Sequence, residues 1–213
     1  MGVTERKARE REQREEAIIT AAKRVFLRKG LILSTMDDIA AEAELAKGTL
    51  YRHYRSKEDL MLVINERAMQ ELHAQFLQAL EEVGPSTGLA KLLRLVQAYY
   101  EFGQANPAYF SFIAFFESPF PTTSVSTLYK TSQASRALVR QLVLQGMADG
   151  SIRTDLEVEL LVNILWAGSY GIMQLVVTRG PHLVADQGLS LHDLFATYLA
   201  TVESGLRAGA PPR

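Results

Sequence analysis

The stretch GLILSTMDDIAAEAELAKGTLYRHYRSKEDL, residues 30–60, decides the fold of this chain. Its first half predicts a short helix that runs to about Ala43, because Ser34 or Thr35 can serve as the N-cap. Asp38 follows Thr35 at the spacing of a capping box. Apolar residues at helical spacing form the predicted buried face: Met36, Ile39, Ala40 and Ala43.

The second half of the stretch predicts a turn and two further helices. Glu44-Leu45-Ala46 separates the first helix from a second short one, which runs from Lys47 to about Tyr54. Ser56 can cap a longer helix, since Asp59 stands at the matching position. That helix carries an apolar residue at every fourth position: Leu60, Ile64, Ala68, Leu72, Phe76 and Leu80. At about 1.5 Å per residue it is on the order of 40 Å long and can span the molecule.

Two short helices joined by a three-residue turn are the arrangement of a helix-turn-helix. In that motif the first helix braces the unit, and the second is presented to the major groove of DNA. The second helix would bury Leu45 and Leu50, while Gly48 allows close approach of its backbone. Its outward polar side chains would be Lys47, Thr49, Arg52 and His53.

A helix upstream of this motif would complete a three-helix domain. Its apolar stripe comprises Ile18, Ala21, Ala22, Val25 and Phe26, and Gly30 ends it. Residues 1–30 contain nine Lys and Arg against five Glu, although the whole chain has a formal net charge of −1. The basic charge gathers at the N-terminal end, as expected for a surface that meets phosphate. A solvated helix of mixed charge is the alternative interpretation.

These residues resemble the N-terminal domain of the TetR family of transcriptional regulators. The resemblance covers about 45 residues and rests on Phe26, Gly30, Thr35, Ile39-Ala40, Gly48-Thr49-Leu50-Tyr51, Tyr54 and Ser56-Lys57-Glu58. The sequence departs from the family pattern at two positions. Glu44 stands where the family usually has Gly, so a non-Gly residue must accept the turn geometry. Ala46 stands where the family usually has Ser, which removes a helix cap.

The resemblance implies functions for the individual residues of the motif. Thr35, Tyr51 and Lys57 would contact phosphates, Thr35 through its hydroxyl or the local backbone N–H. The candidates for base edges are Lys47, Thr49, Arg52 and His53, because Arg can bind guanine bidentately and the Thr methyl can meet a thymine methyl. Gly48 and Tyr54 complete the expected DNA-binding residues. Structural alternatives are a cap for Thr35, a packing aromatic for Tyr51 and a solvated charge for Lys57.

The rest of the chain also follows helical periodicity, so the predicted fold class is all-α with about nine helices. Asp155 can cap a helix that would stop at 179–181, and Ser190 with Asp193 can cap the last one. The helical pattern stops at Asn106-Pro107 and is expected to resume through Glu117. We expect three parts: a DNA-binding domain at 1–57, an effector-binding and dimerisation domain at 58–207, and a flexible tail at 208–213.

Residues 160–178 form an uncharged run of 19 residues, near the length of a membrane-spanning helix. Because the run contains Asn163, Ser169 and Gln174, we favour burial in a core or an interface over insertion in a membrane. By the family resemblance, the last two long helices would form a homodimer contact, with ordinary monomer core as the alternative. The expected contact residues are Leu161, Leu165, Gly168, Ile172, Leu194 and Tyr198.

Residues 99–120 are crowded with aromatic side chains, which by default would pack as core. The alternative is an apolar pocket for a flat or greasy effector. Its candidate lining residues are Phe76, Tyr99, Phe102, Phe112, Phe115, Phe116, Trp166 and Tyr170. Without clustered basic residues, a highly anionic ligand is disfavoured. The helix that begins near Lys57 would transmit ligand binding to the DNA-binding motif.

No sequence motif favours an enzyme. The chain has no cysteine, which excludes disulfides and thiolate metal sites. Its four histidines are scattered, and GPSTGLAKL at 84–92 lacks the Gly-Lys-Ser/Thr ending of a phosphate loop. We therefore expect no metal and no cofactor.

The sequence as a whole predicts a cytoplasmic, ligand-responsive regulator. The N-terminus lacks the apolar stretch of a signal peptide. As a repressor, the protein would bind a near-palindromic double-stranded operator as a homodimer and be released by a small apolar or aromatic effector. The alternatives are a membrane-associated regulator, and a helical binding protein or enzyme without a DNA function.

Overall fold

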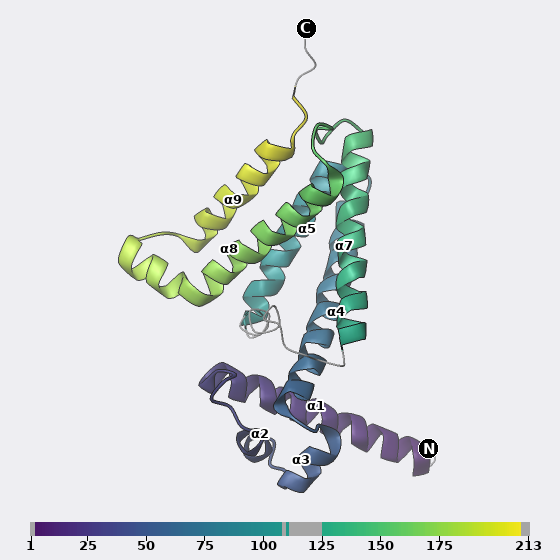
Figure 1. Cartoon of the computed structure of the whole chain (residues 1–213), viewed down its shortest axis with the longest axis vertical. Coiled ribbons are helices and arrows are strands. Elements are labelled where there is room, and N and C mark those ends of the chain that lie inside the picture. Colours follow the sequence, from purple (N-terminus) through teal and green to yellow (C-terminus); the bar gives the residue numbers. More distant parts are fainter. Residues whose placement is uncertain (1–2, 108–109, 111–124, 210–213) are drawn as a thin grey trace.

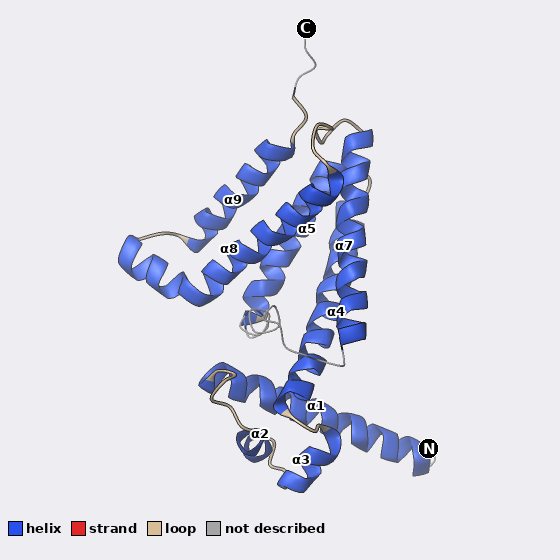
Figure 2. Cartoon of the chain, viewed as in Figure 1, coloured by secondary structure: helices blue, strands red, loops and turns tan. Residues whose placement is uncertain are grey.

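The computed structural model describes residues 3–107, 110 and 125–209, and these residues contain eight α-helices and no strand (Figure 1). The helices are α1 Val3–Lys29, α2 Met36–Glu42, α3 Lys47–His53, α4 Lys57–Val83, α5 Gly88–Ala105, α7 Val125–Ala148, α8 Val158–Gln187 and α9 Leu191–Leu206. Figure 2 shows helix and loop alone over this part of the chain. The all-α prediction is confirmed. The pattern expected through Glu117 lies almost entirely outside the described residues.

The N-terminal helices α1, α2 and α3 enclose a small apolar core together with the first turns of α4 (Figure 1). α1 ends before Gly30, whose φ of 71° is a left-handed conformation that favours glycine. Thr35 caps α2 in a capping box with Asp38, as the sequence predicts. Ser56 caps α4 by accepting a hydrogen bond from the backbone N–H of Asp59 at 3.1 Å.

Helix α4 takes part in both halves of the molecule. Leu60, Met61 and Ile64 pack into the N-terminal core. From Ala68 to Ala79 the buried residues of the same helix join the larger, C-terminal core. One continuous helix thus connects the helix-turn-helix to the rest of the chain (Figure 1).

The C-terminal half is built from α4, α5, α7, α8 and α9 around one apolar core. α9 docks on α5 through Tyr100 and Phe195, whose rings stack with centroids 3.8 Å apart. It docks on α8 through Tyr198, whose hydroxyl lies 3.1 Å from Ser169 Oγ. The polypeptide therefore places α8 and α9 side by side at one edge of the molecule (Figure 1).

Helix α8 is longer than the sequence suggests. Its N-cap is Glu157, while Asp155 pairs with Arg153. The helix continues through Pro181 and ends only before Gly188, which has a φ of 64°. Pro181 has no backbone N–H and cannot donate the helical hydrogen bond. Packing explains why the helix continues, because Leu183 in its last turns is buried and stabilises the helical conformation.

Within the described residues, α8 is also the one helix long and apolar enough to cross a membrane by length and composition. It packs against α5, α7 and α9 and buries Leu161, Leu165 and Met173 among other residues. Its opposite side exposes Leu160 to 61% and Ile164 to 67%. One side of the helix is therefore core, and the other is an uncovered apolar face.

Candidate nucleic-acid interface and apolar pocket

Helix α3 presents nearly all of its surface to solvent at the end of the molecule opposite the C-terminus (Figure 1). Leu50 is its one buried residue and anchors it in the N-terminal core. Lys47, Gly48 and Arg52 are exposed, and Tyr51 is half exposed. Of the four side chains that the sequence places outward, Lys47 and Arg52 are thus exposed, whereas Thr49 and His53 are partly buried. A short exposed helix braced from behind is the geometry that a major groove accepts.

The turn between α2 and α3 carries both departures from the family pattern. Glu44 adopts a φ of 55°, the left-handed conformation for which Gly is the ordinary residue. Ala46 occupies the N-cap of α3 and makes no side-chain cap hydrogen bond. Both positions therefore behave as expected from the sequence, and together they make this turn less stable than it could be.

Two of the predicted base-contacting residues have weak partners at the surface. Lys47 Nζ lies 2.5 Å from Asp37 Oδ2, and both side chains are more than half exposed. Arg52 donates to Thr49 Oγ1 at 3.2 Å. Exposed pairs of this kind contribute little stability, so DNA phosphates or bases can replace the protein partners.

His53 and Tyr54 turn toward α1 and away from the exposed side of α3. His53 Nδ1 lies 3.6 Å from Glu15, and its side chain is only 15% exposed. Tyr54 is half-buried against the N-terminal core, where burial, and next the charge of Glu15, raise its pKa. These two residues are less accessible than the exposed Lys47, Gly48, Tyr51 and Arg52.

Thr35 is fully engaged in capping α2. Its hydroxyl donates to Asp38 Oδ2 at 2.9 Å and accepts from the Asp38 backbone N–H at 3.1 Å, and its own N–H donates to the same carboxylate. Lys29 approaches Asp38 at 2.5 Å, and this hydrogen bond is the main reason that the pKa of Asp38 is lowered. The cap joins the end of α1 to the start of α2.

Lys57 holds the loop between α1 and α2. Its ammonium group donates to the carbonyls of Leu31 at 3.0 Å, Ile32 at 3.2 Å and Ser34 at 3.0 Å. An ammonium has three N–H donors, so these contacts use all of them. In this conformation Lys57 positions the loop, and a direct phosphate contact would require it to release a carbonyl.

A basic groove between α1 and α3 is a feature that the sequence alone does not reveal. It is lined by Lys7, Glu10, Arg11, Arg14, Arg52 and His53. Lys7, Arg11 and Arg14 are spaced so that they fall on one face of α1. This spacing is the available signal, but only the fold shows that the face borders α3 (Figure 1).

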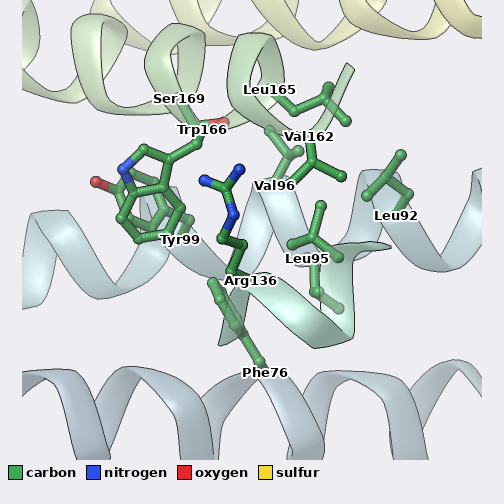
Figure 3. Close-up of a pocket in the computed structure, with 11 residues that line it drawn as sticks. Phe76, Leu92, Leu95, Val96, Tyr99, Arg136, Val162, Leu165, Trp166 and Ser169 are labelled. Carbon is green, nitrogen blue, oxygen red and sulfur yellow. The ribbon is translucent and has the colours of Figure 1, made fainter. Parts of the chain in front are cut away.

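The C-terminal half contains an apolar pocket between α4, α5, α7 and α8 (Figure 3). Its lining residues are Phe76, Leu92, Leu95, Val96, Tyr99, Arg136, Val139, Val162, Leu165, Trp166 and Ser169. The cavity holds about 40 Å³ of free space. Pockets for drug-sized ligands span roughly 300–1,000 Å³, so such a ligand would have to displace the walls.

Three of the predicted ligand contacts, Phe76, Tyr99 and Trp166, line this pocket. Phe102 does not line the pocket and is fully buried in the core. Tyr170 also lies outside the lining and accepts a hydrogen bond from Gln174 at 3.0 Å. Phe112, Phe115 and Phe116 lie outside the described residues. Arg136 and the aliphatic walls from α5 and α8 were missed, since single residues on separate helices give no local pattern.

Most of the residues expected at the dimer contact pack within their own chain. Leu161 and Leu165 are buried in the core of their own chain, and Leu165 also lines the pocket. A Cβ on Gly168 would lie 2.8 Å from the Tyr198 hydroxyl, so this glycine permits packing of α8 on α9 within the chain. Leu194 and Tyr198 are partly buried against the same core, and Ile172 is half-buried. The large exposed apolar residues on α8 are Leu160, Ile164 and Val184, and the first two each directly precede a predicted contact residue.

No group of three or more His, Asp and Glu that could hold a metal gathers in the described part of the chain.

The comparisons with known proteins agree with this geometry. Residues 18–64 match the family described as bacterial regulatory proteins, tetR family. The chain is 26% identical over 197 residues to the HTH-type transcriptional repressor KstR2 of Mycolicibacterium smegmatis, covering 91% of this chain and 90% of that protein. It is 24% identical over 193 residues to the repressor DhaR of Mycobacterium sp., covering 88% and 93%.

Solved structures share the fold over nearly the whole chain. The ketosteroid transcriptional regulator KstR2 of Mycobacterium tuberculosis superposes with a TM-score of 0.73 at 22% identity, covering 92% of this chain and 96% of that one. FadR of Bacillus subtilis, solved in complex with stearoyl-CoA, gives 0.71 at 19% identity, covering 89% and 98%.

The exposed helix-turn-helix, its shared helix α4 and these relatives define a DNA-binding transcriptional regulator. Residues 18–64 of this chain are similar to the DNA-binding part of the TetR family of bacterial regulatory proteins. Regulators of this family bind DNA operators and small-molecule effectors, typically as dimers.

Proposed function

We propose that this protein is a cytoplasmic repressor that binds a near-palindromic operator as a homodimer and leaves it when a small, mainly apolar effector enters the α4–α5–α7–α8 pocket. The observation that carries the proposal is the exposed α3, anchored by Leu50 and flanked by replaceable surface pairs. Two relatives that match most of this chain are named repressors, which supports repression over activation.

On DNA, the residues of the motif divide into contacting and positioning groups. Lys47, Thr49 and Arg52 would face base edges, Tyr51 would contact phosphate, and Gly48 would allow close backbone approach. Thr35 and Lys57 would act chiefly by fixing the α1–α2 loop, and His53 and Tyr54 by holding α3 against α1. The basic face of α1 would add phosphate contacts beside α3.

A two-fold dimer would cover the exposed apolar face of α8. Leu160 and Ile164 are exposed on α8, and α9, which packs beside α8, exposes small residues such as Ala196 and Ala200. Such a face on both chains is self-complementary, and burying it removes apolar surface from water. A membrane is the competing cover for the same face, and gel filtration in detergent-free buffer separates the two.

The coupling between sites would run through α4. This helix begins at Lys57, which holds the α1–α2 loop, and reaches Phe76 in the pocket wall. Because the cavity has about 40 Å³ of free space, a drug-sized ligand must push its walls outward. A displacement of α4 would then move α3 in each subunit. By linkage, operator DNA must weaken effector binding by the same factor.

Selection of bound duplexes from a random pool tests the DNA-binding part of the proposal. We expect inverted half-sites with centres roughly 34–36 Å apart, as two equivalent reading helices require. Arg52→Ala should relax the preference at one position of each half-site. Gln78→Ala, on the distant exposed surface of α4, is the control and should select the same sequences. Recovery of no preferred sequence by the wild-type protein would refute the proposal.

A further inference from the structure

Arg136 is the single charged residue among those that line the apolar pocket. Its side chain comes from α7 and is 34% exposed. The guanidinium donates to Asn163 Oδ1 at 2.9 Å, which directs it toward α8 (Figure 3). The pocket is thus an apolar cavity with one cation at its wall.

The positive charge of Arg136 is only partly balanced by its surroundings. Its Nη2 lies 3.7 Å from Glu159, whereas Arg140 holds the same carboxylate at 2.7 Å. Two guanidinium groups therefore share one carboxylate, which leaves a local excess of positive charge. The two contacts of Arg136 also do not use all the N–H donors that a guanidinium has.

We propose that the pocket takes an amphipathic acid, a mainly apolar molecule whose single carboxylate pairs with Arg136. The inference rests on the proposed effector pocket and names the class of its ligand. Burial of the apolar body against Leu92, Val96 and Val162 supplies binding energy. The guanidinium adds a charge-assisted and geometrically matched contact to a carboxylate, which a neutral molecule of the same shape does not gain. A polyanion meets one available cation and the nearby Glu159, so it is disfavoured.

Trp166 provides the readout, because it is the one tryptophan of the chain and lines the pocket. The probes are decanoate and decanamide, which share one apolar body and differ in charge. Adamantane carboxylate and its amide repeat the comparison with a compact body. We expect the full-length protein to bind each acid about tenfold more tightly than its amide, the effect of one partly exposed charge-assisted contact.

Two substitutions test whether Arg136 causes the preference for acids over amides. Arg136→Met keeps an apolar stem and should reduce acid affinity to that of the amide, while amide affinity stays within about twofold. Arg140→Met is the matched control, since it removes the other partner of Glu159 from outside the pocket lining. That variant should still prefer the acids.

Glu159→Gln separates ligand pairing from a structural function of Arg136. It removes the carboxylate that competes for this guanidinium, so acid affinity should rise and amide affinity should not. If circular dichroism shows that Arg136→Met is unfolded, Arg136→Lys keeps the charge and should retain a preference for the acids.

Equal binding of acids and amides by the wild-type protein overturns the proposal, as does failure of both acids to bind. An equal loss of preference in Arg136→Met and Arg140→Met also overturns it, because charge alone would then be responsible. The proposed function is tested apart, by DNA affinity with saturating decanoate. An Arg136-dependent preference with unchanged DNA affinity supports the ligand class and contradicts the effector mechanism.

Discussion

At the scale of single residues, the α2–α3 turn contains a strained backbone conformation. Glu44 holds a left-handed φ of 55° without the freedom of glycine. That conformation costs a non-glycine residue about 1–2 kcal/mol. The motif therefore carries a local strain that a single substitution can remove.

We expect Glu44→Gly to stabilise the protein by about 1 kcal/mol, because glycine adopts this φ without a steric penalty, although it loses more backbone freedom on folding. Urea unfolding monitored by circular dichroism measures the change. Ala41→Gly, at an exposed position inside α2, is the control and should destabilise by about 1 kcal/mol. A loss of stability in both variants would show that the turn is not strained.

Asn65 is a second residue whose environment conflicts with its chemistry. It lies on α4 between the part in the N-terminal core and the part in the larger core, and it is 3% exposed. Neither Oδ1 nor Nδ2 has a hydrogen-bond partner in the described structure. A buried amide left unsatisfied costs about 1–3 kcal/mol.

Asn65→Leu should therefore raise the free energy of unfolding by about 1 kcal/mol or more, since leucine has the same branching and no polar atoms to satisfy. Chemical denaturation gives the value directly. Asn65→Asp should do the opposite, because it buries a charge without a partner. Destabilisation by the leucine would mean that the site lacks room or that the amide is satisfied in solution.

The DNA contacts that the sequence assigns to single residues stay predictions, and the sequence does not indicate which protein groups these residues contact. Thr35 and Lys57 were expected at phosphates, yet their donors serve the cap and the α1–α2 loop. Motif residues reveal that a position matters, but the partner of a long side chain such as Lys57 depends on a loop 26 residues away. Arg136 was invisible for the same reason, since its importance arises from walls on other helices.

At the scale of elements, the N-terminal helices were predictable because their boundaries are local. Caps at Thr35 and Ser56 and the stop at Gly30 lie within a few residues of the helix ends they fix. The end of α8 was not predictable, because burial of Leu183 outweighs the local signal of Pro181. The side of α8 that faces the core was also not predictable, because a helix that is apolar on nearly all sides does not indicate which side is buried.

The basic face of α1 makes an element-scale prediction. Lys7→Gln with Arg11→Gln should lower the magnitude of the slope of log affinity against log salt by about one unit for each phosphate that the protein no longer neutralises. Fluorescence anisotropy with a selected duplex at several salt concentrations measures this slope.

The matched control is Arg6→Gln with Arg9→Gln, on positions that do not line the groove. Each pair removes one arginine that pairs with a glutamate, Arg11 with Glu15 or Arg6 with Glu10, and the same total charge. Equal slopes for the two double variants would show that α1 contributes only general charge.

The exposed face of α8 makes another prediction. Ile164→Glu should weaken dimerisation at least about tenfold, because it places a carboxylate in an apolar contact. Multi-angle light scattering at micromolar concentration reports the mass. Leu77→Glu, at a 45% exposed site on α4, should leave the mass unchanged. Gly168→Leu is unsuitable here, since it would strike Tyr198 within the same chain. A monomeric wild-type protein contradicts the dimer.

At the scale of the whole molecule, one helix links two tasks. α4 shares its first turns with the core of the DNA-binding motif and its middle with the pocket, so a displacement of this helix would reach both sites. The pocket holds little free space, and Lys47 on the exposed side of α3 makes a surface pair that DNA can replace. This arrangement suits a regulator that releases its operator when it binds a ligand.

The most direct measurement compares DNA affinity for a selected near-palindromic duplex with affinity for a duplex of equal length and composition in which both half-sites are scrambled. At one fixed salt concentration, we predict that scrambling weakens binding about a thousandfold or more, as expected for specific readout by α3. Affinities that agree within about threefold would contradict the account, because the exposed helix would then contact DNA without reading its sequence.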